Sequence, residues 1–222
     1  MAPYILSKIV TQDPSIKNLI FDLGGVIIDL SIDETLHSFA TLAGVDQQAI
    51  NKLYSTAPEF LSYETGHLTD AEFRSFINLH CTTPVSDQSI DACWNGMLRG
   101  LPKIKLDLIL SLKDKYNVYL LSNTNAIHLK YINEVMLPGI PGALPSLDDY
   151  FHRAYYSHIM GKRKPHADIF EEVLTQSGLK ASESLFLDDN HDNIVGAGKV
   201  GIKTAFVNTP DYILTYFNEP GK

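Results

Sequence analysis

Several apolar stretches of this chain end in side chains that carry charge or form strong hydrogen bonds. In chain order the first ends in a carboxylate and the second in a hydroxyl followed by an amide. A cationic turn with a lysine ahead of a proline follows the third, and the fourth ends in a pair of carboxylates. These residues are Asp22, Ser122, Asn123, Lys164, Asp188 and Asp189. A fold that collects them at one place holds a nucleophile, hydrogen-bond donors for an anion and an acidic cluster.

A cluster of carboxylates of this kind needs a cation. Two unit charges about 4 Å apart repel by about 4 kcal/mol at an effective dielectric constant of about 20. Carboxylate oxygens together with a backbone carbonyl suit Mg²⁺, which keeps several of its waters and binds substrate phosphate. One aspartate can then attack phosphorus, because carboxylates form acyl-phosphate intermediates. Since lysine, hydroxyl and amide groups stabilise the phosphoryl oxygens, these residue types indicate Mg²⁺-dependent phosphoryl transfer.

The elements that position these residues are predicted to be buried strands. Their apolar side chains are consecutive instead of alternating, as in parallel strands that are covered on both faces. The predicted strands are Asn18–Gly24, Val118–Asn123, Arg153–Ser157, Ser184–Asp189 and Lys203–Asn208. Helical patterns separate them, including a segment that runs from Pro165 to Gly178. We therefore predict an α/β fold with a doubly wound parallel sheet, in which chemistry gathers at the carboxyl ends of the strands.

The segment between the first predicted strand and the next core helix interrupts this alternation with helical patterns of its own. Two capping boxes mark predicted helix starts, Ser31 with Glu34 and Thr69 with Glu72. We predict a core domain of residues 1–30 and 102–222 and an inserted all-helical cap domain of residues 31–101. Long insertions after a strand end commonly carry lids and substrate filters.

Composition and charge narrow the possible partners. The chain has 222 residues and a net charge of −8, which argues against a nucleic-acid partner because an acidic surface repels phosphate backbones. Cys81 and Cys93 have neither disulfide-framework density nor metal-motif spacing, which is typical of a reducing compartment. No stretch reaches the roughly 20 apolar residues of a membrane span, and the first residues lack a secretory signal. We expect a cytoplasmic monomer or weak homodimer that acts on a small phosphorylated metabolite and binds neither nucleic acid nor membrane.

Four short segments together resemble the haloacid dehalogenase superfamily. They are FDLGGV at Phe21–Val26, LLSNTN at Leu120–Asn125, KP at Lys164–Pro165 and FLDDNHDN at Phe186–Asn193. Their order and spacing match the four motifs of that superfamily, and the helical insertion lies where the family carries its helical cap. The segment YETG at Tyr63–Gly66 is similar to the branch that holds sugar-1-phosphate phosphatases and the phosphatase half of soluble epoxide hydrolases.

The resemblance implies a Rossmann-like core with a bound Mg²⁺ ion. Asp22 is the implied nucleophile and also a metal ligand, with the Gly24 carbonyl and Asp189 as further ligands. Asp188, which we include among the candidate metal-site residues, and Asn193 would hold metal-bound waters or orient the lysine. These residues form the metal side of the implied site.

The phosphoryl side of the implied site is formed by Ser122, Asn123 and Lys164. Ser122 and the Asn123 amide would bind the transferring phosphoryl group, and Lys164 would neutralise its charge. The charges of Asp22, Asp188, Asp189 and a phosphate dianion sum to −5. Mg²⁺ and the lysine reduce this net charge to −2. Without a metal the site would repel its own substrate.

The chain departs from the family pattern at Gly24. Phosphatases of the family usually carry an aspartate two positions after the nucleophile, which acts as general acid and base. General acid–base catalysis contributes roughly 10² to 10⁴ in rate, so a substrate with a good leaving group, or a proton donor from the cap, is expected to compensate. Glu64 and His67 are the candidate donors.

Other polar and aromatic residues have simpler interpretations. Asp192 is predicted to start a helix rather than to bind metal, and Trp94 and Tyr63 are predicted core aromatics of the cap that could also line a sugar pocket. The histidines His128, His158, His166 and His191 lack metal-motif spacing and are predicted to lie at the surface or behind the site.

The leading hypothesis is a phosphatase that hydrolyses a small phosphate monoester, such as a hexose 1-phosphate, through an aspartyl-phosphate intermediate. Alternatives are a pseudophosphatase that binds phosphate or Mg²⁺ without turnover, and a phosphosugar mutase. A dehalogenase needs neither the metal nor the acidic pair, and a phospho-receiver domain would place its acidic pair before the nucleophile. The dehalogenase therefore fits these residue types less well, and the phospho-receiver domain fits their order less well.

Overall fold

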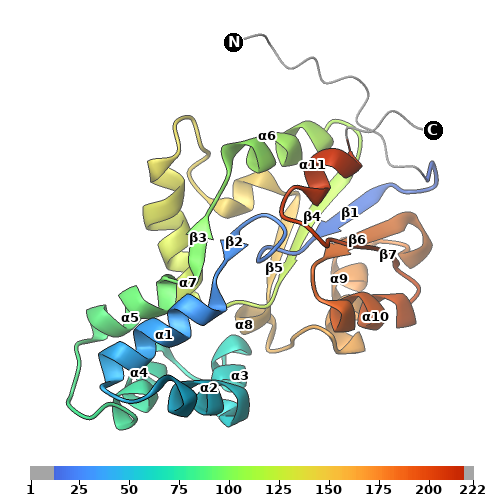
Figure 1. The fold of residues 1–222 in the computed structure, drawn as a ribbon. Helices are drawn as coiled ribbons and strands as arrows, with labels where there is room; N and C mark the ends of the chain where they lie inside the picture. The colour runs from blue at the N-terminus through green and yellow to red at the C-terminus, as the bar shows by residue number, and fades with distance from the viewer. Residues whose placement is uncertain (1–12, 218–222) are drawn as a thin grey trace.

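The computed structural model describes residues 13–217 and is built around one parallel sheet. The strands lie in the order β5 (Arg153–Tyr156), β4 (Asn117–Ser122), β1 (Asn18–Phe21), β6 (Ser184–Asp188) and β7 (Lys203–Phe206) (Figure 1). All five predicted strands are present, and the predicted α/β fold with a doubly wound parallel sheet is confirmed.

Helices cover both faces of this sheet. On one face, α6 (Lys103–Leu112) and α11 (Tyr212–Tyr216) pack on a cluster that includes Leu19 and Phe21. On the other face, α9 (Ala167–Ser177) and α10 (His191–Lys199) pack on a cluster that includes Ile20 and Phe186. Successive residues of β1 therefore enter opposite apolar layers, which explains why its apolar side chains are consecutive.

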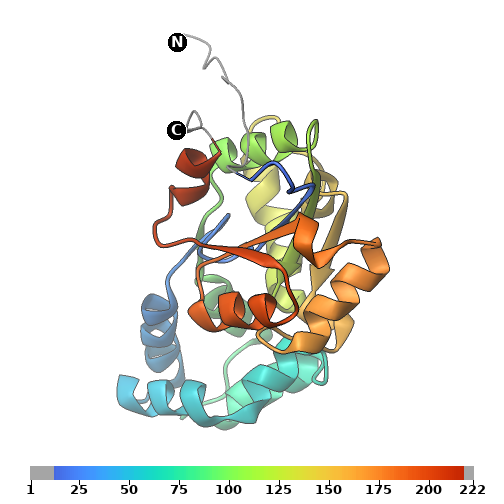
Figure 2. The same cartoon turned by 90° about the vertical axis from the view of Figure 1, so that its right-hand side faces the viewer.

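Five helices lie between β1 and the next core helix. They are α1 (Ile32–Ala43), α2 (Gln47–Thr56), α3 (Pro58–Glu64), α4 (Asp70–Leu79) and α5 (Asp87–Asn95). Figures 1 and 2 show them gathered at one end of the molecule, and they share a separate apolar core. The two connections to the sheet pair with each other as the antiparallel strands β2 (Asp29–Leu30) and β3 (Leu98–Gly100). Over the described residues this arrangement supports the proposed division into a core (13–30 and 102–217) and a cap (31–101), although β3 means that the cap segment is not entirely helical. Residues 1–12 and 218–222 of the proposed core lie outside the described residues.

Short helices complete the chain around the sheet. They are α7 (Ala126–Tyr131), a π-helical segment (Ile132–Met136), α8 (Ser157–Met160) and 3₁₀ turns at Leu137–Gly139, Leu147–Tyr150 and Ala181–Glu183. In the described part of the chain, none of the helices is both long enough and apolar enough to cross a bilayer.

The predicted helix starts are partly confirmed. Thr69 and Glu72 form the predicted capping box at α4. The predicted box at Ser31 is wrong, because its side chain makes no cap hydrogen bond and Glu34 pairs with Arg99 of β3 instead. The Ser31 N–H donates to Met97 O, so the pairing of the two connections dictates the local conformation.

Candidate active site

The carboxyl ends of three neighbouring strands bring the predicted residues together. Phe21 of β1 lies beside Leu120 of β4 and Leu187 of β6. The chain therefore runs into Asp22 next to the ends of β4 and β6, which carry Ser122 and Asp188. The Asp22 N–H continues the ladder by donating to Leu187 O at 2.9 Å.

Three carboxylates converge at this edge. One oxygen each from Asp22, Asp188 and Asp189 lies within 4.8 Å of the others. The Lys164 ammonium lies between two of them, 2.7 Å from Asp22 Oδ1 and 2.7 Å from Asp188 Oδ2. Lys164 is only 1% exposed and Asp188 is completely buried, so a single buried cation faces a larger negative charge.

Asn123 holds the lysine in place through its side chain. Its Nδ2 donates to Lys164 O at 3.0 Å, and its Oδ1 accepts from the Lys164 N–H at 3.0 Å. This reciprocal pair joins the end of β4 to the segment that carries Lys164, which is followed by a cis bond to Pro165. The sequence did not predict this positioning role, because the two residues are 41 positions apart.

Asp188 is already saturated with hydrogen bonds. Its carboxylate accepts from Lys164 Nζ, from the Asn190 N–H at 2.7 Å and from Asn193 Nδ2 at 3.0 and 3.1 Å. The geometry therefore suits the alternative in which Asp188 and Asn193 orient the lysine. Asp192 is exposed in the first turn of α10, behind its Asn190 N-cap, as predicted for a helix-start residue.

Burial and mutual repulsion shift the titration of the cluster. Burial and the neighbouring Asp188 charge outweigh Lys164 and raise the pKa of Asp22 to about 8. Burial, followed by the charge of Asp188, also raises the pKa of Asp189. Burial opposes the charge of Lys164, yet Asp188 and Asp22 outweigh it and raise the pKa of the ammonium. The carboxylates thus lack compensating positive charge, which is the condition that favours a bound divalent cation.

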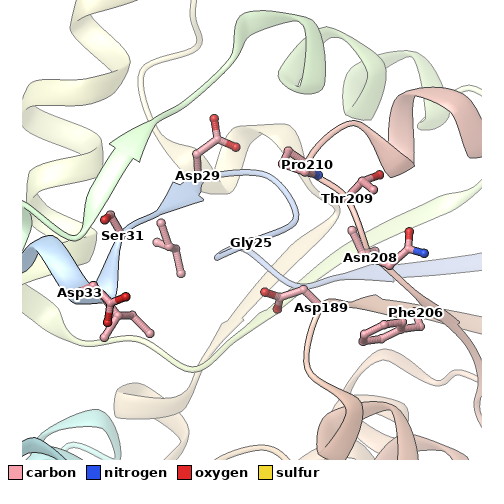
Figure 3. A pocket seen from close by; sticks show the side chains of 12 residues that line it. Gly25, Asp29, Ser31, Asp33, Asp189, Phe206, Asn208, Thr209 and Pro210 are labelled. Carbon is pink, nitrogen blue, oxygen red and sulfur yellow. The ribbon is translucent and has the colours of Figure 1, made fainter. Parts of the chain in front are cut away.

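The donor set fits Mg²⁺. Asp22 and Asp189, together with the Gly24 carbonyl, are the residues that would hold the ion, and Asp189 points into an open cavity of about 810 Å³ (Figure 3). When bound, Mg²⁺ would supply positive charge that stabilises negatively charged phosphoryl oxygens. Asp29, Asp33 and Phe206 also line this cavity.

Gly25 sets the position of Asp189. It has a φ of +71°, and a Cβ added there would lie 2.0 Å from Asp189 Oδ2. We expect Gly25→Ala to weaken Mg²⁺ binding about 10- to 100-fold, because the carboxylate must move from its place. Isothermal titration calorimetry measures this change.

Gly178→Ala is the matched control for this prediction. Gly178 has a similar φ of +64° but nothing within 4 Å of an added Cβ, so its substitution introduces backbone strain without displacing a carboxylate. Equal Mg²⁺ affinity in Gly25→Ala and wild type would contradict the assigned role of Asp189.

A second, narrower cavity lies between the sheet edge and the cap helices. Gly24, Ser122 and Asn123 line it from the core, and Glu64, Trp94 and other residues line it from the cap. Leu30 lines both cavities, so they adjoin beside the carboxylate cluster. The second cavity therefore lies between the strand ends and the cap.

Of the two candidate proton donors, only Glu64 is placed at this cavity. Its carboxylate is ion-paired with Arg163 at 3.1 Å, yet burial outweighs that cation and raises the pKa of Glu64. His67 is exposed and pairs with Thr65 Oγ1 at 2.8 Å, and it is not among the residues that line the cavity.

The YETG segment connects the cap to the core. Tyr63 Oη donates to Asp70 and accepts from the Ile127 N–H of the core. Ser157 Oγ donates to Glu64 O at 2.5 Å, and a Cβ at Gly66 would lie 2.1 Å from His158 O. The glycine is therefore required by close backbone contact between the two parts.

His128 does not lie at the surface, which corrects one of the two alternatives predicted for it. It is 5% exposed and stacks on Trp94, with ring centroids 5.0 Å apart and an interplanar angle of 11°. Asn125 caps α7 by accepting from the His128 N–H. The sequence signal that could have predicted this position is the helix N-cap at Asn125, which places His128 in the first turn of α7, where it packs on Trp94 of the cap. His166 and His191 are exposed and His158 is half-buried.

Burial of His128 predicts a loss of stability in acid. Burial lowers the pKa of His128 to about 3, whereas an unfolded histidine titrates near 6.5. Below about pH 6.5 the histidine takes up a proton in the unfolded chain but not in the folded protein. The free energy of unfolding is therefore unaffected by His128 above about pH 6.5 and decreases as the pH falls toward 3. Between pH 6.5 and pH 5 the contribution is about 2 kcal/mol.

We therefore expect the free energy of unfolding to fall about 2 kcal/mol less in His128→Phe than in wild type between pH 7 and pH 5. Urea unfolding at the two pH values measures the difference. Trp94→Phe disturbs the same ring stack without removing a titratable group and serves as the control. Parallel pH dependence in wild type and His128→Phe would contradict the prediction.

Comparisons with known proteins agree with this geometry. A family profile described as haloacid dehalogenase-like hydrolase matches residues 16–201. The chain is 33% identical to a D-ribitol-5-phosphate phosphatase of Bacteroides thetaiotaomicron over 189 residues, which cover 85% of this chain and 90% of that protein.

Solved structures give the same relationship. The enzyme BT-2542 of Bacteroides thetaiotaomicron, a protein of the same family crystallised with magnesium and inorganic phosphate, superposes with a TM-score of 0.79 at 39% identity and covers 86% of this chain and 93% of its own. A predicted hydrolase of Porphyromonas gingivalis, described as haloacid dehalogenase-like, has a TM-score of 0.79 at 33% identity, with 86% and 91% coverage. An L-2-haloacid dehalogenase of Xanthobacter autotrophicus, at 19% identity with a TM-score of 0.57, shares the fold.

Proposed function

Because this chain belongs to the haloacid dehalogenase-like hydrolase family and is a Mg²⁺-dependent phosphatase of a small phosphorylated metabolite, we propose that it hydrolyses a sugar or polyol phosphate through an aspartyl-phosphate intermediate on Asp22. The observation that carries the proposal is the buried Lys164 ammonium 2.7 Å from Asp22 Oδ1, beside two further carboxylates.

The contacts of Asp22 indicate which oxygen attacks. Lys164 Nζ and the Leu23 N–H, at 2.7 Å each, both contact Oδ1. We assign Oδ2 as the nucleophile, because the described residues leave it without such a contact. It forms a bond to phosphorus while the bond from phosphorus to the leaving oxygen breaks, and that oxygen takes up a proton. Water then attacks phosphorus, which releases phosphate and restores the carboxylate.

The remaining residues bind and orient the phosphoryl group. Ser122 is buried at the end of β4 and, with Asn123, lines the cavity beside Gly24. We assign Ser122 Oγ and the Asn123 N–H as hydrogen-bond donors to the phosphoryl oxygens. Lys164, held by Asn123 and Asp188, contributes the fixed positive charge.

Two substrate classes are favoured by separate observations. The relative named D-ribitol-5-phosphate phosphatase favours a polyol phosphate whose phosphate is on a primary alcohol. Gly24, which leaves the usual acid–base position without a carboxylate, favours a better leaving group such as the anomeric oxygen of a hexose 1-phosphate. We rank the polyol phosphate first, because that relative is covered over 90% of its length.

A screen of phosphorylated metabolites with Mg²⁺, scored by released phosphate, tests this function. We expect ribitol 5-phosphate and related polyol phosphates to have the highest kcat/KM, and acid quenching during turnover to trap a phosphate adduct on the peptide that contains Asp22. A flat substrate profile would contradict the substrate class. Turnover without a trapped adduct on that peptide would contradict the intermediate.

Glu64 is the proposed proton donor to the leaving oxygen. We expect Glu64→Gln to lower kcat for ribitol 5-phosphate about 10²-fold, because an alkoxide requires protonation as it departs. The loss of kcat for 4-nitrophenyl phosphate should be much smaller, because nitrophenolate leaves without a proton. His67→Gln is the control, since His67 lies outside the cavity. Equal losses of kcat for both substrates in Glu64→Gln would contradict the assignment.

A further inference from the structure

Two buried polar atoms beside the second cavity have no hydrogen-bond partner. Five buried side-chain polar atoms in residues 13–217 lack a partner, and among the residues that carry them only Trp94 and His128 line this cavity. The atoms are Trp94 Nε1 and His128 Nε2. Buried polar groups in folded proteins are almost always hydrogen-bonded, so an unpaired atom beside a substrate cavity suggests a partner that arrives with the substrate.

The hydrogen bond of His128 to Asn95 indicates the role of its other nitrogen. His128 Nδ1 lies 3.1 Å from Asn95 Oδ1. With the Asn95 carbonyl oxygen as acceptor, Nδ1 carries the proton and Nε2 presents a lone pair. Burial keeps the ring neutral by lowering the pKa of His128 to about 3. His128 is therefore an acceptor at Nε2, whereas the indole N–H of Trp94 is a donor only.

The two rings form a rigid unit. They stack at 5.0 Å with an interplanar angle of 11°, and Trp94 also packs against Phe39, Phe60 and Phe73. Trp94 is 3% exposed and His128 5% exposed. A donor and an acceptor held in one stack match a hydroxyl group, which both accepts and donates a hydrogen bond.

We propose that Trp94 Nε1–H and His128 Nε2 recognise a hydroxyl group of the leaving group. This pair makes the enzyme selective for hydroxylated phosphate monoesters over alkyl phosphates that lack hydroxyl groups. The inference rests on the proposed function and names the side chains that define its substrate class. Gly24, Ser122 and Asn123 line the same cavity, which joins the pair to the phosphoryl site. Because the cavity volume of about 60 Å³ admits only a few water-sized groups, it suits a short hydroxylated segment.

Asn95 acts as a positioning residue in this arrangement. It does not line the cavity, but it fixes the proton on His128 Nδ1. Asn95→Leu removes the acceptor and frees the ring to exchange tautomers, so it should weaken hydroxyl recognition without changing any cavity-lining side chain. This separates recognition by His128 from the packing of its ring.

The test compares two ligands of equal chain length, ribitol 5-phosphate and n-pentyl phosphate. Their dissociation constants are measured by calorimetry with Mg²⁺ in the Asp22→Asn background, where no turnover is expected. We expect ribitol 5-phosphate to bind at least about 10²-fold more tightly in the parent, because a site built for a hydroxyl rejects an analogue that lacks it. Trp94→Phe, His128→Phe and Asn95→Leu should each reduce this ratio roughly tenfold.

Fluorescence provides a readout that does not depend on activity. Trp94 is the single tryptophan of the chain, so ribitol 5-phosphate should change its emission, and n-pentyl phosphate should change it less. Circular dichroism confirms that each variant is folded before its ratio is interpreted. His128→Gln retains a side-chain acceptor and should recover part of the ratio that His128→Phe loses.

The outcomes separate this inference from the proposed function. If the parent binds both ligands within threefold, or if the three variants weaken both equally, hydroxyl recognition by the pair is wrong even when phosphate release continues. If ribitol 5-phosphate binds selectively and the three variants reduce that selectivity, but wild type releases no phosphate from any metabolite, the proposed function fails and the recognition pair stands.

Discussion

Asp22→Asn should reduce phosphate release by at least about 10⁴-fold, both for 4-nitrophenyl phosphate and for the best metabolite of the screen. The amide is a poor nucleophile, and loss of a nucleophile removes the covalent route entirely. The amide oxygen that the substitution introduces can still accept from the Leu23 N–H, which now contacts Asp22 Oδ1 at 2.7 Å. Lys164 keeps its second partner, because Asp188 Oδ2 lies 2.7 Å from its ammonium, so the substitution should not strongly destabilise the fold.

Asp192→Asn is the matched control for this prediction. Asp192 lies in the same motif as Asp188 and Asp189, but it is exposed at the start of α10 and lies outside the carboxylate cluster. Its substitution should change kcat/KM by less than about threefold. If Asp22→Asn retains more than about 1% of wild-type activity while Asp192→Asn behaves as expected, Asp22 is not the nucleophile.

Lys164→Met should cause the largest loss of stability of any substitution at the site. The lysine is 1% exposed and neutralises two carboxylates that are themselves buried. Breaking a buried ion pair by removing one partner costs about 3–5 kcal/mol, because it leaves the other charge uncompensated. We expect a loss of this size in the free energy of unfolding at pH 7 with EDTA, and a smaller loss with Mg²⁺ in excess.

The same substitution should lower kcat/KM about 10²- to 10³-fold, because it removes the fixed positive charge that faces the phosphoryl oxygens. Urea unfolding and steady-state kinetics measure the two effects. Lys162→Met is the control. Lys162 is two residues away and pairs with Glu172 at 2.6 Å in a partly exposed position, so its loss should change the free energy of unfolding far less than the loss of Lys164.

A second substitution shows whether charge is the cause. In Lys164→Met combined with Asp188→Asn, one of the two uncompensated carboxylates is neutral. We expect the double variant to recover at least half of the stability that Lys164→Met loses, although not the activity. No recovery would mean that packing of the lysine stem, and not the charge of the ammonium, accounts for the loss.

The sequence by itself determined the sheet and the residues that meet at its edge. Consecutive apolar residues at Asn18–Phe21 and Ser184–Asp188 identify strands that are covered on both faces. When such strands are parallel neighbours in one sheet, the residues that follow them lie together at the same edge of the sheet. That is why Asp22, Ser122 and Asp188 were predicted correctly as neighbours without any knowledge of contacts.

Only the tertiary structure decided which side chains hold and surround those residues. The reciprocal bonds between Asn123 and Lys164, the ion pair of Glu64 with Arg163 and the stack of Trp94 on His128 each join segments that are distant in the chain. The failed cap at Ser31 has the same origin, because Glu34 pairs with Arg99, 65 residues away. Local spacing specifies a helix or a strand, but it contains no information on which polar group of another element will lie within 3 Å.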